Sequence, residues 1–266
     1  MSFSLSPTTF QYFSDVHSEL YEPNNIATFD DQIQMCAPYL LLAGDIGDPF
    51  SQSYYDFIRV VSSKGYKHIL IVSGNHEYYG YDDGRGHWME RTDDKIRNVV
   101  RHFPNVSFLQ NNMIDIPGTD LTVFGGTFWT RVSTEEENNA RKYLKDYREI
   151  PHFSLEKAHE LHNDSCLQLQ RAINDRPHKR FIVMSHHLPS SDLIDPIYID
   201  KQPAINSTYA CDIEIAKSDM IVAWIAGHTH TPVQKGKFYV NPIGYPGENS
   251  VIDFNKTFSI TYQAQR

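Results

Sequence analysis

The segment MIVAWIAGHTH, residues 220–230, joins an apolar run of strand length to two histidines that lie two positions apart. In an extended or turning backbone the side chains at i and i+2 fall on the same side. His228 and His230 can therefore bind one ion each or share a pair of ions. Taken alone, the pattern is equally typical of two polar residues in a loop, so the choice depends on how the other strands end.

Four further predicted strands, at 10–14, 39–44, 68–73 and 180–185, also end in Asp, Asn or His. They supply Asp15, His17, Asp45, Asp48, Asn75, His76, His186 and His187. Each cluster alone has a structural explanation, since Asp and Asn commonly cap helices and turns. The structural explanation does not account for five clusters together, because it would require five independent coincidences. All five lie at the ends of strands, where an α/β sheet forms its ligand crevice. We therefore interpret His228 and His230 as metal ligands.

Glycines precede three of these clusters, at positions 44, 74 and 227. We interpret them as the residues that allow a sharp turn from strand to loop.

The whole chain alternates between predicted strands and helices. Other strands are predicted at 106–110, 121–126, 220–227, 237–241 and 258–263, and helices at 51–65, 90–103, 134–146 and 155–175. This order predicts an α/β fold of two packed sheets covered by helices, in one domain spanning 1–266. We expect the charged segment 127–153 to form a helical cap or lid.

The amino-acid composition indicates which kinds of molecule the protein can bind and in which compartment it resides. The formal charge of −9 opposes binding to long polyanions, whose affinity comes largely from Lys and Arg. No apolar run approaches the ~20 residues that span a bilayer, and the first residues lack the pattern of a signal peptide. Three cysteines, far apart and in no CxxC pair, are typical of a reducing compartment. We therefore expect a cytoplasmic protein that binds neither membranes nor nucleic acid.

The chemistry follows from the types of ligand. The set contains no cysteine, which excludes a structural zinc site made of thiolates. Carboxylate, imidazole and amide ligands suit manganese, iron, zinc or cobalt. Seven candidate ligands are too many for one ion but suit two, if one carboxylate bridges them. Two-metal sites clamp the attacking and leaving oxygens of an in-line displacement, so hydrolysis of a phosphate ester is the natural assignment.

The ordered motifs DxH, GD, GNHE, a strand-end His and GHTH resemble the calcineurin-like metallophosphoesterase superfamily. The resemblance covers residues 11–247, and SHHLPS, GHTH and NPIGYPGE are similar to a small bacterial-type subgroup. It implies a four-layer α-β-β-α double β-sandwich flanked by helices. It also implies two divalent ions and a bridging water or hydroxide as nucleophile. Manganese is the metal we favour, with iron, zinc, cobalt or nickel as alternatives.

Carried over residue by residue, the resemblance assigns Asp15, His17, Asp45 and His230 to one ion, and Asp45, Asn75, His186 and His228 to the other. Asp45 is the bridge. His76 matches the histidine that faces the substrate, and Asp48 takes the position of its acidic partner. His186 and His187 are adjacent and either can reach the metal; we favour His186, which directly follows the strand, and leave His187 for contact with the substrate.

The expected substrate is a small phosphomonoester or phosphodiester, such as a nucleotide or a cyclic nucleotide. Candidate substrate contacts are Trp129, Arg131, Arg148 and Tyr245, since aromatic faces stack on bases and arginine pairs with phosphate. Core packing explains Trp129 equally well. One alternative is a nuclease or end-processing phosphodiesterase, although no basic groove is visible in the composition. The second is a non-catalytic scaffold, although such proteins typically lose ligands that this chain retains. The sequence does not determine the oligomeric state.

Overall fold

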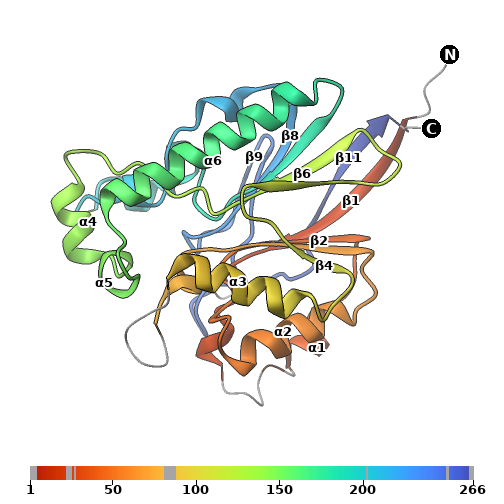
Figure 1. The fold of residues 1–266 in the computed structure, drawn as a ribbon, viewed down its shortest axis with the longest axis horizontal. Helices are drawn as coiled ribbons and strands as arrows, with labels where there is room; N and C mark the ends of the chain where they lie inside the picture. Colours follow the sequence, from red (N-terminus) through yellow and green to blue (C-terminus); the bar gives the residue numbers. More distant parts are fainter. Residues whose placement is uncertain are drawn as a thin grey trace.

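The computed structural model describes residues 5–21, 26, 28–80, 88–201, 203–249 and 252–263. Two β-sheets pack face to face, and helices cover the outer face of each sheet (Figure 1). The predicted α/β fold of two sheets flanked by helices is therefore confirmed. The ends of the range 1–266 lie outside the described residues, and its organisation as a single domain stays a prediction.

The first sheet contains β1 (Leu5–Phe13), β2 (Tyr39–Ala43), β3 (His68–Val72), β4 (Val106–Phe108) and β11 (Thr257–Gln263), in the order β11-β1-β2-β3-β4. β1 to β4 are parallel to one another. β11 pairs antiparallel with β1, with Leu5 opposite Gln263. Every residue of β2 is buried, as a central parallel strand covered on both faces requires.

The second sheet contains β5 (Asn112–Asp115), β6 (Leu121–Gly125), β7 (Arg180–Met184), β8 (Ile221–Ala226), β9 (Val233–Lys235) and β10 (Phe238–Val240). Its order is β5-β6-β7-β8-β10-β9, with antiparallel strands at both edges and parallel strands between them. The sequence did not predict β5 and β9. Both are partly exposed edge strands without the continuous apolar run that marks the central ones.

The helices are α1 (Thr28–Gln32), α2 (Gln52–Ser62), α3 (Met89–Val100), α4 (Glu137–Tyr143), α5 (Asp146–Glu149), α6 (Leu155–Asp175) and α7 (Pro196–Ile199). Short 3₁₀ turns occupy Ser18–Leu20, His76–Tyr78, Ser191–Leu193, Asn206–Thr208 and Glu214–Lys217. The two longest predicted helices begin at serine caps. Ser51 accepts a hydrogen bond from the Tyr54 amide and Ser154 accepts one from the Lys157 amide.

The main core lies between the two sheets. Leu41 and Leu70 of the first sheet pack in one cluster with Val123, Ile182 and Ile225 of the second sheet, and all five are fully buried. Separate apolar clusters lie beneath the helices on the two outer faces. The sheets are thus fixed relative to each other, which sets the positions of the loops at their edges.

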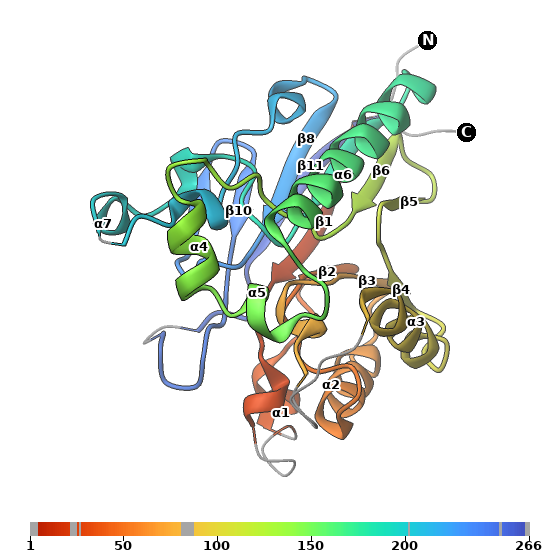
Figure 2. The same cartoon turned by 60° about the vertical axis from the view of Figure 1, so that its left-hand side comes forward.

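The segment 134–146 was expected to be one helix, but the structure divides it. Leu144 has an extended backbone, with φ −79° and ψ 137°, and its side chain is buried. Burying this leucine ends α4, and α5 begins two residues later at Asp146. Figure 2 shows α4, α5 and α7 on the same side of the molecule.

Candidate metal centre

Five parallel strands end beside one another, and polar residues follow each of them. β1, β2 and β3 lead to Asp15, Asp45 and Asn75, and β7 and β8 of the other sheet lead to His186 and His228. The Asn75 Oδ1 atom lies 3.1 Å from His186 Nε2, and the rings of His186 and His228 have centroids 4.9 Å apart. The two sheets therefore contribute to the same site.

Most of these residues have a backbone conformation that side chains rarely adopt. Five of the eight described non-glycine residues with positive φ are candidate ligands: Asp15, His17, Asp45, His228 and His230, with φ between 50° and 74°. Each such residue costs ~1–3 kcal/mol and persists only where the surrounding structure enforces it. Backbone strain is therefore concentrated at the candidate ligands, a pattern that is common at functional sites.

The glycines before the ligands serve two different purposes. Gly44 has a φ of +86° and makes the sharp turn expected from the sequence. Gly74 and Gly227 do not have positive φ, so for them the turn interpretation is wrong. A Cβ on Gly74 would lie 2.1 Å from Asp45 Oδ1, and one on Gly227 would lie 2.6 Å from Asp15 Oδ2. These two glycines leave room for the carboxylates.

The first group of potential ligand atoms belongs to Asp15, His17 and His230. His17 Nε2 lies 3.1 Å from His230 Nε2, and His230 Nε2 lies 3.4 Å from Asp15 Oδ1. The opposite nitrogens of both rings face carboxylates: His17 Nδ1 lies 3.3 Å from Glu19 Oε1, and His230 Nδ1 lies 2.6 Å from Glu248 Oε2. A carboxylate behind each imidazole orients the ring and leaves Nε2 available to a metal.

The second group belongs to Asp45, His186 and His228. His186 Nδ1 donates to the Ala43 carbonyl at 2.9 Å, which turns Nε2 toward Asp45 Oδ2 at 3.3 Å. Asp45 Oδ2 also lies 3.8 Å from His17 Nε2 of the first group. The same carboxylate oxygen thus faces both groups, and the Asp45 Oδ1 atom accepts the backbone N–H of His76 at 2.9 Å. A third group of potential ligand atoms, from His17, Asp45 and His76, overlaps the other two.

His187, the alternative to His186, lies outside this cluster. Its ring packs between Trp129 and His228, with centroid distances of 5.0 Å and 4.3 Å. Burial and the neighbouring His186 lower the pKa of His187 to about 3, so the imidazole is neutral. The geometry favours His186 as the ligand.

The residues present fit a pair of divalent ions. The donors are carboxylate oxygens, imidazole nitrogens and one amide oxygen, which suit manganese, iron, zinc and cobalt. The buried Nε2 atom of His228 has no hydrogen-bond partner among the described residues. Such an atom is costly unless something binds it. The close approach of two nitrogens, His17 Nε2 and His230 Nε2, also suits a shared cation.

Protons compete with metal ions for these imidazoles. Burial opposes a charge on His186, but the adjacent Asp45 carboxylate raises its pKa to about 10. Burial likewise opposes a charge on His230, but Asp15 and Glu248 raise its pKa to about 9. An ion that binds here must displace those protons, so metal affinity should rise with pH.

Asn75 is oriented by the predicted cap. Asp146, at the start of α5, accepts a hydrogen bond from Asn75 Nδ2 at 2.9 Å and one from the Tyr79 hydroxyl at 2.5 Å. The amide nitrogen of Asn75 therefore points toward Asp146, and its oxygen points toward His186 Nε2. Asp146 was missed by the sequence analysis, because nothing near position 146 indicates that its carboxylate reaches Asn75.

The substrate-facing candidate His76 lies between a carboxylate and a tyrosine. His76 Nδ1 is 3.4 Å from Glu19 Oε1, and His76 Nε2 is 3.3 Å from the Tyr245 hydroxyl. Burial opposes its charge, but Asp45 and Glu19 raise the pKa of His76. Glu19 is therefore an acidic neighbour of His76 that the sequence did not predict. Asp48 Oδ1 accepts the backbone N–H of Phe50 at 2.9 Å, and its predicted pairing with His76 stays a prediction.

Glu77, the last residue of the GNHE motif, holds the loops that carry the ligands. Its carboxylate accepts backbone N–H groups from Asp45, Ile46 and Gly74 at 3.1, 2.7 and 2.7 Å. Burial and the nearby Asp45 carboxylate raise the pKa of Glu77 to about 8. The residue joins the loops after β2 and β3, a role that the motif alone did not indicate.

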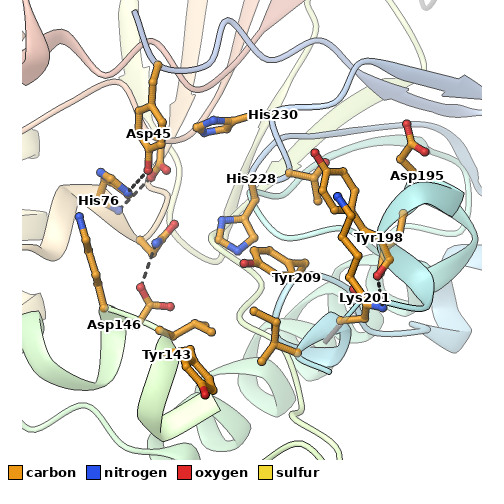
Figure 3. A pocket seen from close by; sticks show the side chains of 18 of the residues that line it. Asp45, His76, Tyr143, Asp146, Asp195, Tyr198, Lys201, Tyr209, His228 and His230 are labelled. Carbon is orange, nitrogen blue, oxygen red and sulfur yellow. Dashed lines mark hydrogen bonds between the residues drawn. The ribbon is translucent and has the colours of Figure 1, made fainter. Parts of the chain in front are cut away.

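A cavity of about 470 Å³ opens beside the cluster (Figure 3). This volume lies within the ~300–1,000 Å³ that is usual for small-molecule sites. Asp45, Asn75, His228 and His230, which we call the ligand wall, line one side. The other side is lined from residues 143–146, 194–201 and 203–209, which we call the outer wall.

Only one of the five predicted substrate contacts lines this cavity. Tyr245 lines it, whereas His187, Trp129, Arg131 and Arg148 are absent from its described lining. Trp129 is 3% exposed and packs against Phe153, so core packing explains it. Arg148 is exposed and donates to the Lys142 carbonyl at 3.2 Å. The cations that line the cavity are instead Lys145 and Lys201, which no local motif marks.

Fold and site together define an α/β protein that presents groups of potential metal ligands at the shared edge of two sheets. Over residues 9–232 the chain matches the calcineurin-like phosphoesterase family, and it belongs to that family. Members of the family are metal-dependent hydrolases of phosphoric esters, in agreement with the ligand groups found here. The narrower likeness to a bacterial-type subgroup stays a prediction.

Two similar proteins extend the comparison. An uncharacterised protein of Acanthamoeba polyphaga mimivirus is 29% identical over 224 residues, which are 77% of this chain and 75% of the viral protein. Among solved structures, a phosphopantetheinyl hydrolase from Mycobacterium tuberculosis superposes with a TM-score of 0.68 at 15% identity, over 90% of each chain. At that identity the structural likeness shows the fold alone.

No helix among the described residues is long and apolar enough to cross a membrane.

Proposed function

We propose that this protein hydrolyses small phosphomonoesters or phosphodiesters with the help of two divalent ions. One ion would be held by Asp15, His17, Asp45 and His230, and the other by Asp45, Asn75, His186 and His228. The observation that carries the proposal is the position of Asp45 Oδ2, which faces His186 at 3.3 Å and His17 at 3.8 Å. A single carboxylate oxygen directed at two ligand groups is what a dinuclear centre requires.

The ions, when bound, supply Lewis acidity for water activation and positive charge for the phosphoryl group. In the reaction the bond between phosphorus and the leaving oxygen breaks, a water oxygen bonds to phosphorus, and the leaving oxygen takes up a proton. We assign that proton to His76 Nε2, since His76 lines the cavity and its other nitrogen faces Glu19. The Glu19 carboxylate favours the protonated ring, and Tyr245 orients it.

The substrate is small because the cavity volume suits a nucleotide-sized molecule and the chain carries a net charge of −9. An acidic protein repels polyanions within about a Debye length, ~8 Å at physiological salt. Bound cations invert this field locally and attract a single phosphoryl group. We keep 127–153 as a cap, because its residues 143–146 reach the cavity. The three free cysteines support our placement of the protein in the cytoplasm.

Metal depletion and reconstitution test the proposal. Purified protein is analysed for bound metals, stripped with a chelator, and reloaded separately with manganese, iron(II), zinc, cobalt or nickel. Nitrophenyl phosphate, bis-nitrophenyl phosphate, nucleotides, cyclic nucleotides and single-stranded DNA then serve as substrates. We expect two ions per chain and hydrolysis of small esters that is lost on stripping and restored on reloading.

The rival functions have distinct outcomes in the same assay. Higher kcat/KM on DNA than on any small ester, with a steep fall on added salt, would identify a nuclease. Two bound ions without hydrolysis of any ester would identify a scaffold.

A further inference from the structure

The outer wall carries two lysines that form no ion pair with any carboxylate in the described parts of the chain. Lys145 and Lys201 both line the cavity, and within the described chain neither has a carboxylate oxygen within 4.0 Å of its ammonium group. Other exposed lysines, such as Lys217 and Lys235, are paired with Glu214 and Asp192. Lys67 and Lys142 also lack an ion pair among the described residues, so the position of Lys145 and Lys201 at the cavity is what distinguishes them.

The acidic residues of the cavity are already engaged elsewhere. Glu248 Oε2 accepts hydrogen bonds from His230 Nδ1 and from the Tyr245 amide. Asp146 holds Asn75, and Asp195 Oδ1 caps α7 by accepting the Ile197 amide at 2.9 Å. Two lysines at the outer wall therefore remain available to an anion that enters with the substrate.

Aromatic rings accompany these lysines. Tyr143, Tyr198 and Tyr245 line the cavity with exposed fractions of 46%, 41% and 39%, and the Lys142 ammonium covers one face of the Tyr143 ring, 4.9 Å from its centroid. The Lys201 ammonium lies over the Tyr198 ring, 4.3 Å from its centroid, which holds the cation in place. Tyr209 lies against His228 at a centroid distance of 5.1 Å, so aromatic lining continues from the ligand wall to the outer wall (Figure 3).

We infer that the substrate is a small phosphoester whose leaving group carries both a planar ring and a second anionic group, as in a nucleoside with two separate phosphates. The inference rests on the proposed function, since it places the scissile phosphoryl group at the ligand wall. The planar ring packs against the tyrosines, and the second anion binds Lys145 and Lys201. A phosphoester with only one of these two features leaves part of the outer wall without a contact.

The inference is tested with four substrates that separate the two features. Adenosine 3′,5′-bisphosphate has a ring and a second phosphate, adenosine 5′-monophosphate has only the ring, fructose 1,6-bisphosphate has only the second phosphate, and nitrophenyl phosphate is the simple ester. With the metal-loaded enzyme we expect kcat/KM for the adenosine bisphosphate to exceed that for each single-feature substrate by ~10-fold or more, as a charge-assisted contact provides.

Variants then assign the preference to the outer wall. In K145Q and K201Q the preference for the bisphosphate over the monophosphate of adenosine should fall by about tenfold, mostly through KM, whereas K217Q serves as the control because Lys217 is exposed and absent from the cavity. In Y198L the preference for adenosine bisphosphate over fructose bisphosphate should fall. Circular dichroism and metal analysis establish that each variant is folded and loaded.

The outcomes separate this inference from the proposed function. Metal-dependent hydrolysis of nitrophenyl phosphate without any preference for the adenosine bisphosphate would overturn the inference alone. A preference that survives in the folded K145Q/K201Q double variant would also overturn it. Failure to hydrolyse any of the four esters, and bis-nitrophenyl phosphate as well, with two ions bound, would overturn the proposed function.

Discussion

The ligand wall and the outer wall line the same cavity but are built in different ways. Asp45 and Asn75 are buried, and Asp45, His228 and His230 keep left-handed backbones within the loops that follow buried strands. In the outer wall, Tyr143 and Tyr198 are nearly half exposed and belong to helices of seven and four residues. The first wall is preorganised for one chemistry. The second, with fewer buried contacts, is where the selection of substrates can change without disturbing the fold.

Replacing Asp45 tests whether the ligand wall acts as a unit. Asp45→Asn keeps the shape but removes the charge that faces both ligand groups, so both ions should bind more weakly. Because the ions supply several kcal/mol to the transition state and 1.36 kcal/mol is tenfold in rate, turnover should fall by ~10³-fold or more. Elemental analysis and rate measurements check this result. Full metal content with wild-type rates would rule out the shared carboxylate.

Replacing His76 separates proton transfer from metal binding in the ligand wall. His76→Gln should keep both ions and lose ~10²–10⁴-fold in rate, the usual contribution of a positioned general acid. The loss should be larger for alkyl esters, whose alkoxide needs a proton, than for nitrophenyl esters, which leave unaided. Rates on matched alkyl and nitrophenyl esters decide the point. Equal losses on both would instead indicate that His76 binds the phosphoryl group.

Replacing Asp146 tests a hydrogen bond through which the outer wall acts on the ligand wall. Asp146→Ala frees the Asn75 amide to turn, so affinity for the ion beside His186 should fall ~10–100-fold, as for other residues that orient a metal ligand. Metal titration measures the effect. Asp192→Ala, an exposed carboxylate paired with Lys235, is the matched control. Two unchanged metal affinities in Asp146→Ala would show that Asp146 does not orient Asn75 for metal binding.

The smallest effect is expected for a residue of the outer wall alone. Tyr143→Leu removes an aromatic face worth ~0.5–1.5 kcal/mol, so KM for nucleotides should rise ~2–10-fold while kcat is kept. Initial-rate kinetics on adenosine 5′-monophosphate give both constants. Leu167→Ala, on the exposed face of α6 and absent from the cavity lining, is the control. A fall in kcat at constant KM would mean that Tyr143 contributes to the ligand wall as well.

The difference between the ligand wall and the outer wall also explains which residues the sequence could predict. His228 and Asp45 are recognisable because each directly follows an apolar run and a glycine, and both signals are local. The two sheets were predictable for the same reason, whereas the edge strands β5 and β9 lack the apolar signal. Asp146 contacts Asn75 across 71 residues, and no local pattern reports such a distance. Trp129 illustrates the converse error, since an aromatic residue near a motif is often part of the core.

Glu19 and Glu248 have a local sequence signal that predicts their contacts only in part. Glu19 stands two residues after His17 and could have been proposed as its partner from the spacing alone. Glu248 belongs to the NPIGYPGE motif, but its contact with His230 depends on the fold of the segment between them, which contains β9 and β10. Residues behind the metal ligands are therefore harder to predict than the ligands themselves.

The pairing of β1 with β11 bears on how the protein can be handled. Leu5 lies opposite Gln263 at one end of β1, and Asp15 follows its other end. Nine residues at ~3.3 Å each separate these ends by about 30 Å. A fluorescent label or a surface tether attached beside Leu5 or Gln263 therefore stays clear of the cavity. A short peptide that joins these two strand ends, with new termini opened at the Gly236 turn, would give a circular permutant. Its loops that carry the candidate ligands would all remain unbroken.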